Sequence, residues 1–353
     1  MYSFSRESLI KPHSDSEWYN YFSDPNFDKI FSYKQNDLGI SYSPEETTFK
    51  LWAPTAKKVS VSLFETGNYR NKTEKPISIT PMSYNDSENV WELTISGDLN
   101  EKYYTYIVEA NGKIHESGDP YAIACGVNGK RSEILDLELT NPENWENDKN
   151  VCYPLNQSII YELHVSDFSY DIMSGIDEKY RGKYMAFTIK DSVFNDDLNK
   201  PTCLNYLKKL GITTVHLLPV FDFESVEEDY LLLEEDENLM DANFNWGYDP
   251  ENYNCPEGSY STDPYDGKIR IIEFKKMVQS LHEENISVIM DVVFNHTYRV
   301  YLSNFEKTVP FYYYRQLPNG DKSGGSGYYN DTDSERLMMH KFIVNSVLYW
   351  ASI

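Results

Sequence analysis

The chain of 353 residues is long enough for two or three domains, and its 40% hydrophobic and 25% charged residues are ordinary for a globular protein. The formal net charge of −24 excludes polyanionic partners such as nucleic acid or an anionic membrane surface, because the excess carboxylates would repel them. The composition therefore favours a neutral ligand.

Neither a targeting segment nor a membrane span is predicted. Residues 1–22 contain no uninterrupted apolar run behind a basic start, and nowhere do about eighteen apolar residues follow one another. The four cysteines form no Cys-x-x-Cys pair and have no nearby histidine cluster, so they indicate neither a zinc site nor a redox motif. We expect free buried thiols in a cytoplasmic protein at Cys125, Cys152, Cys203 and Cys255.

The first third of the chain is predicted to hold a leader and a β-sandwich. Residues 1–35 are polar and aromatic without a clear period, so their fold stays uncertain. Residues 36–125 contain short alternating runs separated by turn signals, and in one run Val59, Val61 and Leu63 share a face. This pattern predicts a small antiparallel β-sandwich. Its clearest strands are expected at 48–54, 58–65, 90–96 and 103–113.

A polar linker at 126–157 is followed by a different pattern at 158–353. Nearly continuous apolar strands alternate there with amphipathic helices, which predicts a parallel sheet buried on both faces. The strands are expected at 158–165, 213–220 and 287–295, and the helices at 201–212, 269–286 and 334–350. The last helix is expected to bury one face, formed by Met339, Phe342, Ile343, Val347 and Trp350.

The loops that leave the carboxyl ends of such strands carry the chemistry of barrel folds, and here they are long. The second of them contains residues 243–270, in which six aromatic rings lie among Asn, Asp, Gly and Pro without any helical or strand period. So many turn formers argue against a core element, and so many rings argue against a plain connection. The segment is interpreted as a binding surface.

Four segments resemble the pullulanase-type (type I) debranching enzymes of the α-amylase superfamily, glycoside hydrolase family 13. They read YELHVSDFS (161–169), HLLPVFDF (216–223), FNWGYDPENYNCPEGSYSTDPY (244–265) and VIMDVVFNH (288–296). The preceding sandwich resembles a family 48 carbohydrate-binding module, with KLWAPTAKKVSVSLF matching its first strands. The signature YNWGYDP is specific for debranching enzymes, and Phe244 replaces its first Tyr. The resemblance covers residue 36 to the last residue.

The resemblance implies a retaining α-1,6-glucosidase fold in which 158–353 is the N-terminal part of a (β/α)8 barrel, comprising its first three βα units. It implies that Tyr248 stacks on a sugar ring and that Trp246 shapes the same pocket. Asp291 and His296 are expected to hydrogen-bond that sugar, and Asp249 lies beside them in the motif. Calcium near Asn295 occurs in relatives, but no metal or other cofactor is predicted here.

Some conspicuous residues have a simpler interpretation. His164 and His216 lie within apolar strands, so satisfied core imidazoles are expected rather than catalytic groups. Trp52 is expected in the core of the sandwich rather than on a starch-binding platform. The family's nucleophile and general acid lie on later strands, and no segment of the form DGFRFD occurs in this sequence. The chain by itself is therefore expected to be inactive and to aggregate through its barrel part.

Three functions stay open. The chain is part of an enzyme that hydrolyses α-1,6 branch points in pullulan, glycogen or starch dextrins, or it is a non-catalytic α-glucan-binding protein, or a second polypeptide supplies the missing strands. Isoamylase-type and branching enzymes are the alternative families. The expected partner is an α-glucan, with no nucleic acid and no membrane, and the sequence leaves the oligomeric state open.

Overall fold

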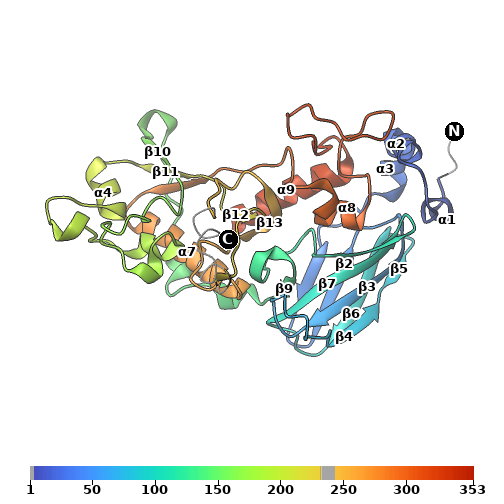
Figure 1. The fold of residues 1–353 in the computed structure, drawn as a ribbon, viewed down its shortest axis with the longest axis horizontal. Coiled ribbons are helices and arrows are strands. Elements are labelled where there is room, and N and C mark those ends of the chain that lie inside the picture. Colours follow the sequence, from blue (N-terminus) through green and yellow to red (C-terminus); the bar gives the residue numbers. More distant parts are fainter. Residues whose placement is uncertain (1–3, 231, 233–242) are drawn as a thin grey trace. The chain divides into compact units, whose positions relative to one another are not determined.

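The structure, a computed structural model, describes residues 4–230, 232 and 243–353 (Figure 1). The chain forms two compact units. The first consists of Met1–Asp136, Asp249–Asn254 and Phe294–Ile353, and the second of Leu137–Tyr248 and Cys255–Val293.

The first unit contains two antiparallel sheets that pack face to face (Figure 1). One sheet has the order β1-β2-β6-β5, and the other has the order β4-β3-β7-β8 with β9 paired to β7. The strands are β1 (Gly39–Tyr42), β2 (Glu46–Leu51), β3 (Ala56–Phe64), β4 (Ser78–Pro81), β5 (Ser83–Asn85), β6 (Val90–Ser96), β7 (Lys102–Ala110), β8 (Lys113–Ser117) and β9 (Ser132–Ile134). The last of these lies within the segment that the sequence predicts as a linker.

Alternating side chains build the core between these sheets. Val59, Val61 and Leu63 of β3 are almost fully buried, as the sequence predicts. Across the sandwich, the rings of Phe49 on β2 and Tyr104 on β7 meet edge to face with centroids 5.2 Å apart. The prediction of an antiparallel sandwich is therefore confirmed, and apolar burial from both sheets holds it together.

The N-terminal leader is helical. It contains α1 (Arg6–Leu9), α2 (Asp15–Ser23) and α3 (Pro25–Phe31), and Asp24 caps α3 by accepting the amide N–H of Asn26. The indole N–H of the buried Trp52 donates to the carbonyl oxygen of Phe31 at 2.7 Å. Trp52 thus belongs to the core, as expected, and joins the leader to the sandwich.

The second unit is organised around three parallel strands in the order β10-β11-β14, of which Figure 1 labels the first two. These are β10 (Ile160–Leu163), β11 (Thr214–Leu217) and β14 (Ser287–Met290). Helix α4 (Cys203–Leu210) lies between the first two in the chain, and α7 (Gly267–Glu283) between the last two. The predicted alternation of strands and helices is confirmed, and Gly211 ends α4 in the left-handed conformation with φ 75°.

The remaining elements are short, apart from the last helix. They are β12 (Phe221–Phe223), β13 (Pro250–Pro256), α8 (Asn304–Thr308) and α9 (Leu337–Ser352). Single 3-10 turns lie at Val127–Gly129, Leu137–Thr140, Trp145–Asn147, Leu155–Gln157, Glu178–Tyr180, Tyr184–Thr188, Phe194–Asp196 and Val300–Leu302.

Three predictions about burial are wrong. The strand at 158–165 is not covered on both faces, because Ile160 and Tyr161 are 52% and 37% exposed on a strand at the edge of the described sheet. On α9, Met339 and Phe342 are buried, but Val347 is 48% exposed. All four cysteines are free, yet Cys152 lies at the surface, in an irregular segment ahead of β10.

A membrane-spanning helix is not found in the part of the chain that the structure describes, since none of its helices combines the necessary length with the necessary apolar character.

One carboxyl group lies deep in the sandwich unit. The Oδ2 atom of Asp119 accepts hydrogen bonds from the hydroxyls of Tyr104 and Tyr106 at 2.8 and 3.0 Å, and Oδ1 accepts the amide N–H of Tyr121. Burial raises the pKa of Asp119 from 3.8 to about 6, although these three hydrogen bonds favour the charged form. The folded chain therefore holds this proton to a higher pH than the unfolded chain does.

We expect the sandwich unit to lose stability as the pH rises from about 4 to about 6. Below pH 4 both states are protonated at Asp119, whereas between the two values only the folded state is, so the free energy of unfolding falls by about 3 kcal/mol across this window. Asp119→Asn should remove this dependence, as measured by urea unfolding at a series of pH values. The exposed Asp86→Asn is the control, and an unchanged slope in Asp119→Asn would contradict the assignment.

Candidate functional site

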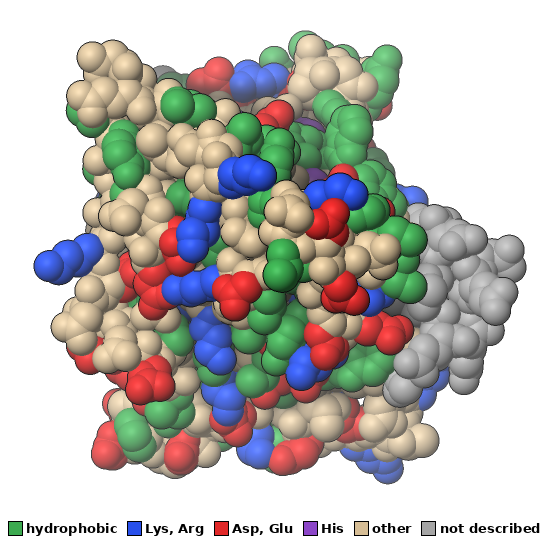
Figure 2. Space-filling view, turned by 90° about the vertical axis from the view of Figure 1, so that its left-hand side faces the viewer, with side chains coloured by type: hydrophobic (Ala, Val, Ile, Leu, Met, Phe, Trp, Pro, Cys, Tyr) green, Lys and Arg blue, Asp and Glu red, His purple; other side chains and the backbone are tan. Residues whose placement is uncertain are grey.

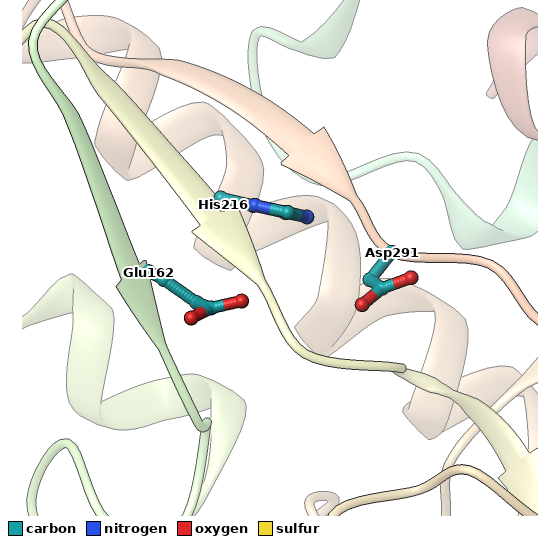
Figure 3. Close-up of side chains that lie close together, drawn as sticks. All are labelled: Glu162, His216 and Asp291. Carbon is teal, nitrogen blue, oxygen red and sulfur yellow. The ribbon is translucent and has the colours of Figure 1, made fainter.

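Three polar side chains meet at the carboxyl ends of the parallel strands (Figure 3). Glu162 on β10 lies directly opposite His216 on β11, and Asp291 is the first residue after β14. Ligand atoms of all three lie within 4.8 Å of one another. The in-register pairing of the strands is what brings them together, because it aligns the ends of three segments that are far apart in the chain.

Tyr248 contacts this cluster directly. Its hydroxyl donates a hydrogen bond of 2.6 Å to the Oδ2 atom of Asp291. Burial raises the pKa of the Tyr248 phenol, and the bond to the carboxylate raises it further, so Tyr248 stays a donor. Two of the predicted substrate-binding residues are thus brought into contact.

The backbone before Tyr248 is held in one conformation. Gly247 adopts φ +88°, and a Cβ atom there would lie 2.8 Å from the carbonyl oxygen of Pro219 and 3.1 Å from the ring of Phe223. Only glycine fits this close approach without a shift of the neighbouring backbone. In addition, the amide N–H of Gly247 donates to the Oδ1 atom of Asn245 at 2.9 Å.

This fixed backbone carries exposed rings. Trp246 is 60% exposed and Phe244 is 53% exposed, whereas Tyr248 is half-buried. Large rings on a held backbone lose little conformational freedom when they bind a ligand. The arrangement agrees with the interpretation of this segment as a binding surface.

The structure places the other two predicted substrate-binding residues in the first unit. Asp249 is half-buried there. His296 is 4% exposed, and its imidazole stacks on the ring of Tyr328 with centroids 3.9 Å apart. The backbone of His296 pairs with that of Asp331, and its carbonyl oxygen accepts the hydroxyl of Tyr253 at 2.8 Å.

A buried cluster of charges supports the loop after β11. The guanidinium of Arg270 on α7 is fully buried and pairs with Glu228 at 2.6 Å and with Asp222 at 3.1 Å. Beside it, Glu257 accepts the backbone N–H groups of Phe223 and Ser259. Burial raises the pKa of Glu257 strongly, and the charges of Glu228 and Asp222 raise it further.

A cavity of about 320 Å³ lies between the loops after β10 and β11 in the second unit. Phe244 and Tyr260 line it on the side of the aromatic segment, and His164 and Lys183 line it from the loop after β10. The ammonium group of Lys183 donates to the carbonyl oxygen of Ser259 at 2.7 Å. The volume of the cavity suits one small ligand or sugar unit.

Two groups have the donor types that bind metals. Glu162, His216 and Asp291 offer two carboxylates and one imidazole, a set that suits a divalent transition metal. Asp222, Glu228 and Glu257 are also close together, but the Arg270 guanidinium already pairs with the first two, so a metal ion does not suit this place. Among the residues that the structure describes, these are the two groups whose His or carboxylate atoms lie close enough together to share an ion.

The sequence pattern does not predict the role of every residue in this cluster. Glu162 lies in the segment YELHVSDFS at the end of its strand, but no local pattern marks it as a site residue. His216 is half-buried in the strand-end cluster, so the expectation of a core imidazole is wrong for it. His164 is 6% exposed and fully hydrogen-bonded, so the same expectation is confirmed there.

Comparison with known protein families places two domains on this chain. Residues 37–122 match carbohydrate-binding module 48 (isoamylase N-terminal domain), and residues 201–324 match the α-amylase catalytic domain. The first match coincides with the sandwich, and the second includes the aromatic segment.

Curated relatives match most of the chain. It is 38% identical to a pullulanase of Bacillus subtilis (strain 168) over 92% of its own length, and 35% identical to the chloroplastic pullulanase 1 of Arabidopsis thaliana over 92%. The chain spans 42% and 35% of those two proteins, less than half of either.

Solved structures agree with these relatives. The chain is 43% identical to a pullulanase from Paenibacillus barengoltzii with a TM-score of 0.85, over 93% of this chain and 48% of that one. The same pullulanase has also been solved in complex with maltohexaose and α-cyclodextrin. A pullulanase from Bacillus acidopullulyticus matches with 40% identity and a TM-score of 0.82, over 93% of this chain and 38% of that one.

We expect the buried Arg270 guanidinium to contribute to the stability of the second unit. Arg270→Met keeps much of the side-chain volume but leaves the Asp222 and Glu228 carboxylates buried without their cation, which should lower the free energy of unfolding by about 3–5 kcal/mol. Urea unfolding followed by circular dichroism measures this. Lys276→Met, on the same helix and partly exposed, is the matched control and should change little. Equal stability of the two variants would refute the role of Arg270.

Proposed function

The chain belongs to the pullulanase-type proteins of glycoside hydrolase family 13, and from this premise we propose that it binds α-glucan as part of an α-1,6-debranching enzyme. We infer further that its three βα units are the first part of a (β/α)8 barrel. The observation that carries the proposal is the hydrogen bond between Tyr248 and Asp291, because it joins the aromatic segment to the strand ends where barrel enzymes do their chemistry.

A neutral carbohydrate fits this site physically. The face of a Tyr or Trp ring offers apolar area to the C–H face of a pyranose and leaves the sugar hydroxyls free for polar partners. The carboxylates of Asp291 and Glu162 can accept hydrogen bonds from sugar hydroxyl groups beside the Tyr248 hydroxyl. On the face of the molecule that Figure 2 shows, Lys and Arg side chains are interspersed with Asp and Glu, which does not favour a polyanionic ligand.

We assign sugar binding to Tyr248, Trp246 and Asp291, and Asp249 and His296 stay predicted substrate-binding residues. The relatives that carry the name pullulanase support an α-1,6-linked substrate. Free cysteines support a cytoplasmic location, because disulfides are rare in that compartment. Neither a metal ion nor another cofactor is part of the proposal.

We expect glucan binding by the 353-residue chain to depend on the aromatic segment. Retarded migration in a native gel containing glycogen measures binding, and both Trp246→Ala and Tyr248→Ala should weaken it about two- to tenfold, because each removes a stacking surface worth about 0.5–1.5 kcal/mol beside a sugar ring.

The matched control is Tyr301→Ala, since Tyr301 is 76% exposed and lies in the first unit on the 3-10 turn Val300–Leu302. It should migrate as the unchanged chain does. The proposal fails if the unchanged chain runs at the same speed with and without glycogen, or if Tyr301→Ala is impaired as strongly as Tyr248→Ala.

We predict that this polypeptide by itself releases no reducing ends from pullulan. Retaining glycosidases need a nucleophile and an acid about 5 Å apart, and the sequence contains no DGFRFD-like segment to supply the first of them. A reducing-sugar assay on the purified chain measures this, with an intact pullulanase as reference. A rate within about a hundredfold of the reference would refute it. Binding without hydrolysis also agrees with a non-catalytic glucan-binding protein, the second candidate.

Addition of a further polypeptide distinguishes the part of a debranching enzyme from the non-catalytic glucan-binding protein. Co-expression with the part of the Bacillus subtilis pullulanase that this chain does not span should restore hydrolysis if the chain is part of an enzyme. Continued binding without any hydrolysis would favour the non-catalytic protein.

A further inference from the structure

The backbone of the aromatic segment is anchored to the strand end by one buried imidazole. His164 follows β10 directly and is 6% exposed. Its Nε2 atom lies 2.8 Å from the carbonyl oxygen of Asn245, which is 81 residues away in the chain. The same nitrogen lies 2.8 Å from the hydroxyl oxygen of Tyr260. All of these residues belong to the second unit.

The surrounding groups determine where the imidazole carries its proton. The Nδ1 atom of His164 accepts the backbone N–H of Asp167 at 3.3 Å, so in the neutral ring the proton lies on Nε2. A carbonyl oxygen can only accept, so Nε2–H donates to Asn245, and the Tyr260 oxygen lies at the same distance from this donor. Both ring nitrogens therefore have partners within the protein.

The imidazole also packs against two rings of the aromatic segment. The Phe244 ring lies 5.1 Å from it between centroids, and the Tyr260 ring meets it edge to face at 5.6 Å. On the other side of the anchor, the Asn245 side chain accepts the amide N–H of Gly247 and donates to the hydroxyl of Ser225. The backbone on both sides of Trp246 is therefore fixed, although its ring is 60% exposed.

We propose that His164 is a positioning residue that holds residues 244–248 in their ligand-binding conformation through the hydrogen bond from Nε2 to the Asn245 carbonyl oxygen. Its imidazole lines the cavity beside this segment, but both ring nitrogens are already bonded within the protein. It sets the positions of Trp246 and Tyr248 before a ligand arrives, so that little conformational freedom is lost on binding. This consequence for glucan binding rests on the proposed function, whereas the anchoring itself does not.

Two amide side chains separate the roles of the two ring nitrogens. In His164→Gln the side-chain nitrogen can occupy the place of Nε2 and still donate to Asn245, whereas the shorter amide of His164→Asn reaches only the place of Nδ1. His164→Leu removes both. His340→Leu, at an exposed position on α9, is the matched control for that loss of polarity.

Hydrogen–deuterium exchange of peptides covering residues 243–249 tests the anchoring without any ligand. We expect exchange there to be at least about tenfold faster in His164→Asn and His164→Leu, near the unchanged rate in His164→Gln, and unaffected in His340→Leu. Peptides from α7 report on the rest of the unit and should exchange as before. Unchanged exchange at 243–249 in His164→Asn would overturn the proposal, and so would equal acceleration in α7.

Slower migration of each variant in a native gel containing glycogen then tests whether the anchoring affects glucan binding. His164→Asn should weaken binding about tenfold while His164→Gln keeps most of it, a contrast that a purely structural role of the side chain does not predict. If His164→Leu does not fold, the Gln and Asn pair still decides the question. Faster exchange in His164→Asn combined with no glycogen binding by the unchanged chain would refute the proposed function and leave the anchoring intact.

Discussion

The parallel, in-register pairing of β10, β11 and β14 is the constraint on which the functional part of this protein depends. Parallel pairing requires long crossovers, which α4 and α7 supply, and it places every carboxyl end of a strand at the same edge. Glu162, His216 and Asp291 meet there although their segments lie far apart in the chain. No local pattern could bring these three side chains together.

Residues 244–248, at the start of the aromatic segment, depend on that edge for their conformation. Tyr248 at the end of this stretch reaches Asp291, and His164, just past β10, holds the carbonyl oxygen of Asn245 near its beginning. Between them, Gly247 lies against the backbone of Pro219, which follows β11. Each of the three strands thus contributes one contact from its carboxyl end, so a segment without regular secondary structure has a defined backbone and exposed rings.

Buried carboxyl groups are accommodated in two ways. In the sandwich, the Asp119 carboxyl group accepts hydrogen bonds from neutral donors, and burial shifts it toward its protonated form. In the second unit, Arg270 compensates two carboxylates, and Glu257 beside them shifts toward its protonated form as well. Both solutions avoid an isolated buried charge, which is the costliest arrangement in a protein interior.

The sequence by itself determined the sandwich and the alternation of strands and helices, because periodicity and turn residues are local properties of the chain. Only the tertiary structure decided that β10 is an exposed edge strand, that His216 joins Glu162 and Asp291, and that His164 anchors the aromatic segment. These features depend on contacts between residues dozens of positions apart. A strand's exposure or an imidazole's partners follow from which segments lie beside it, and local sequence patterns do not contain that information.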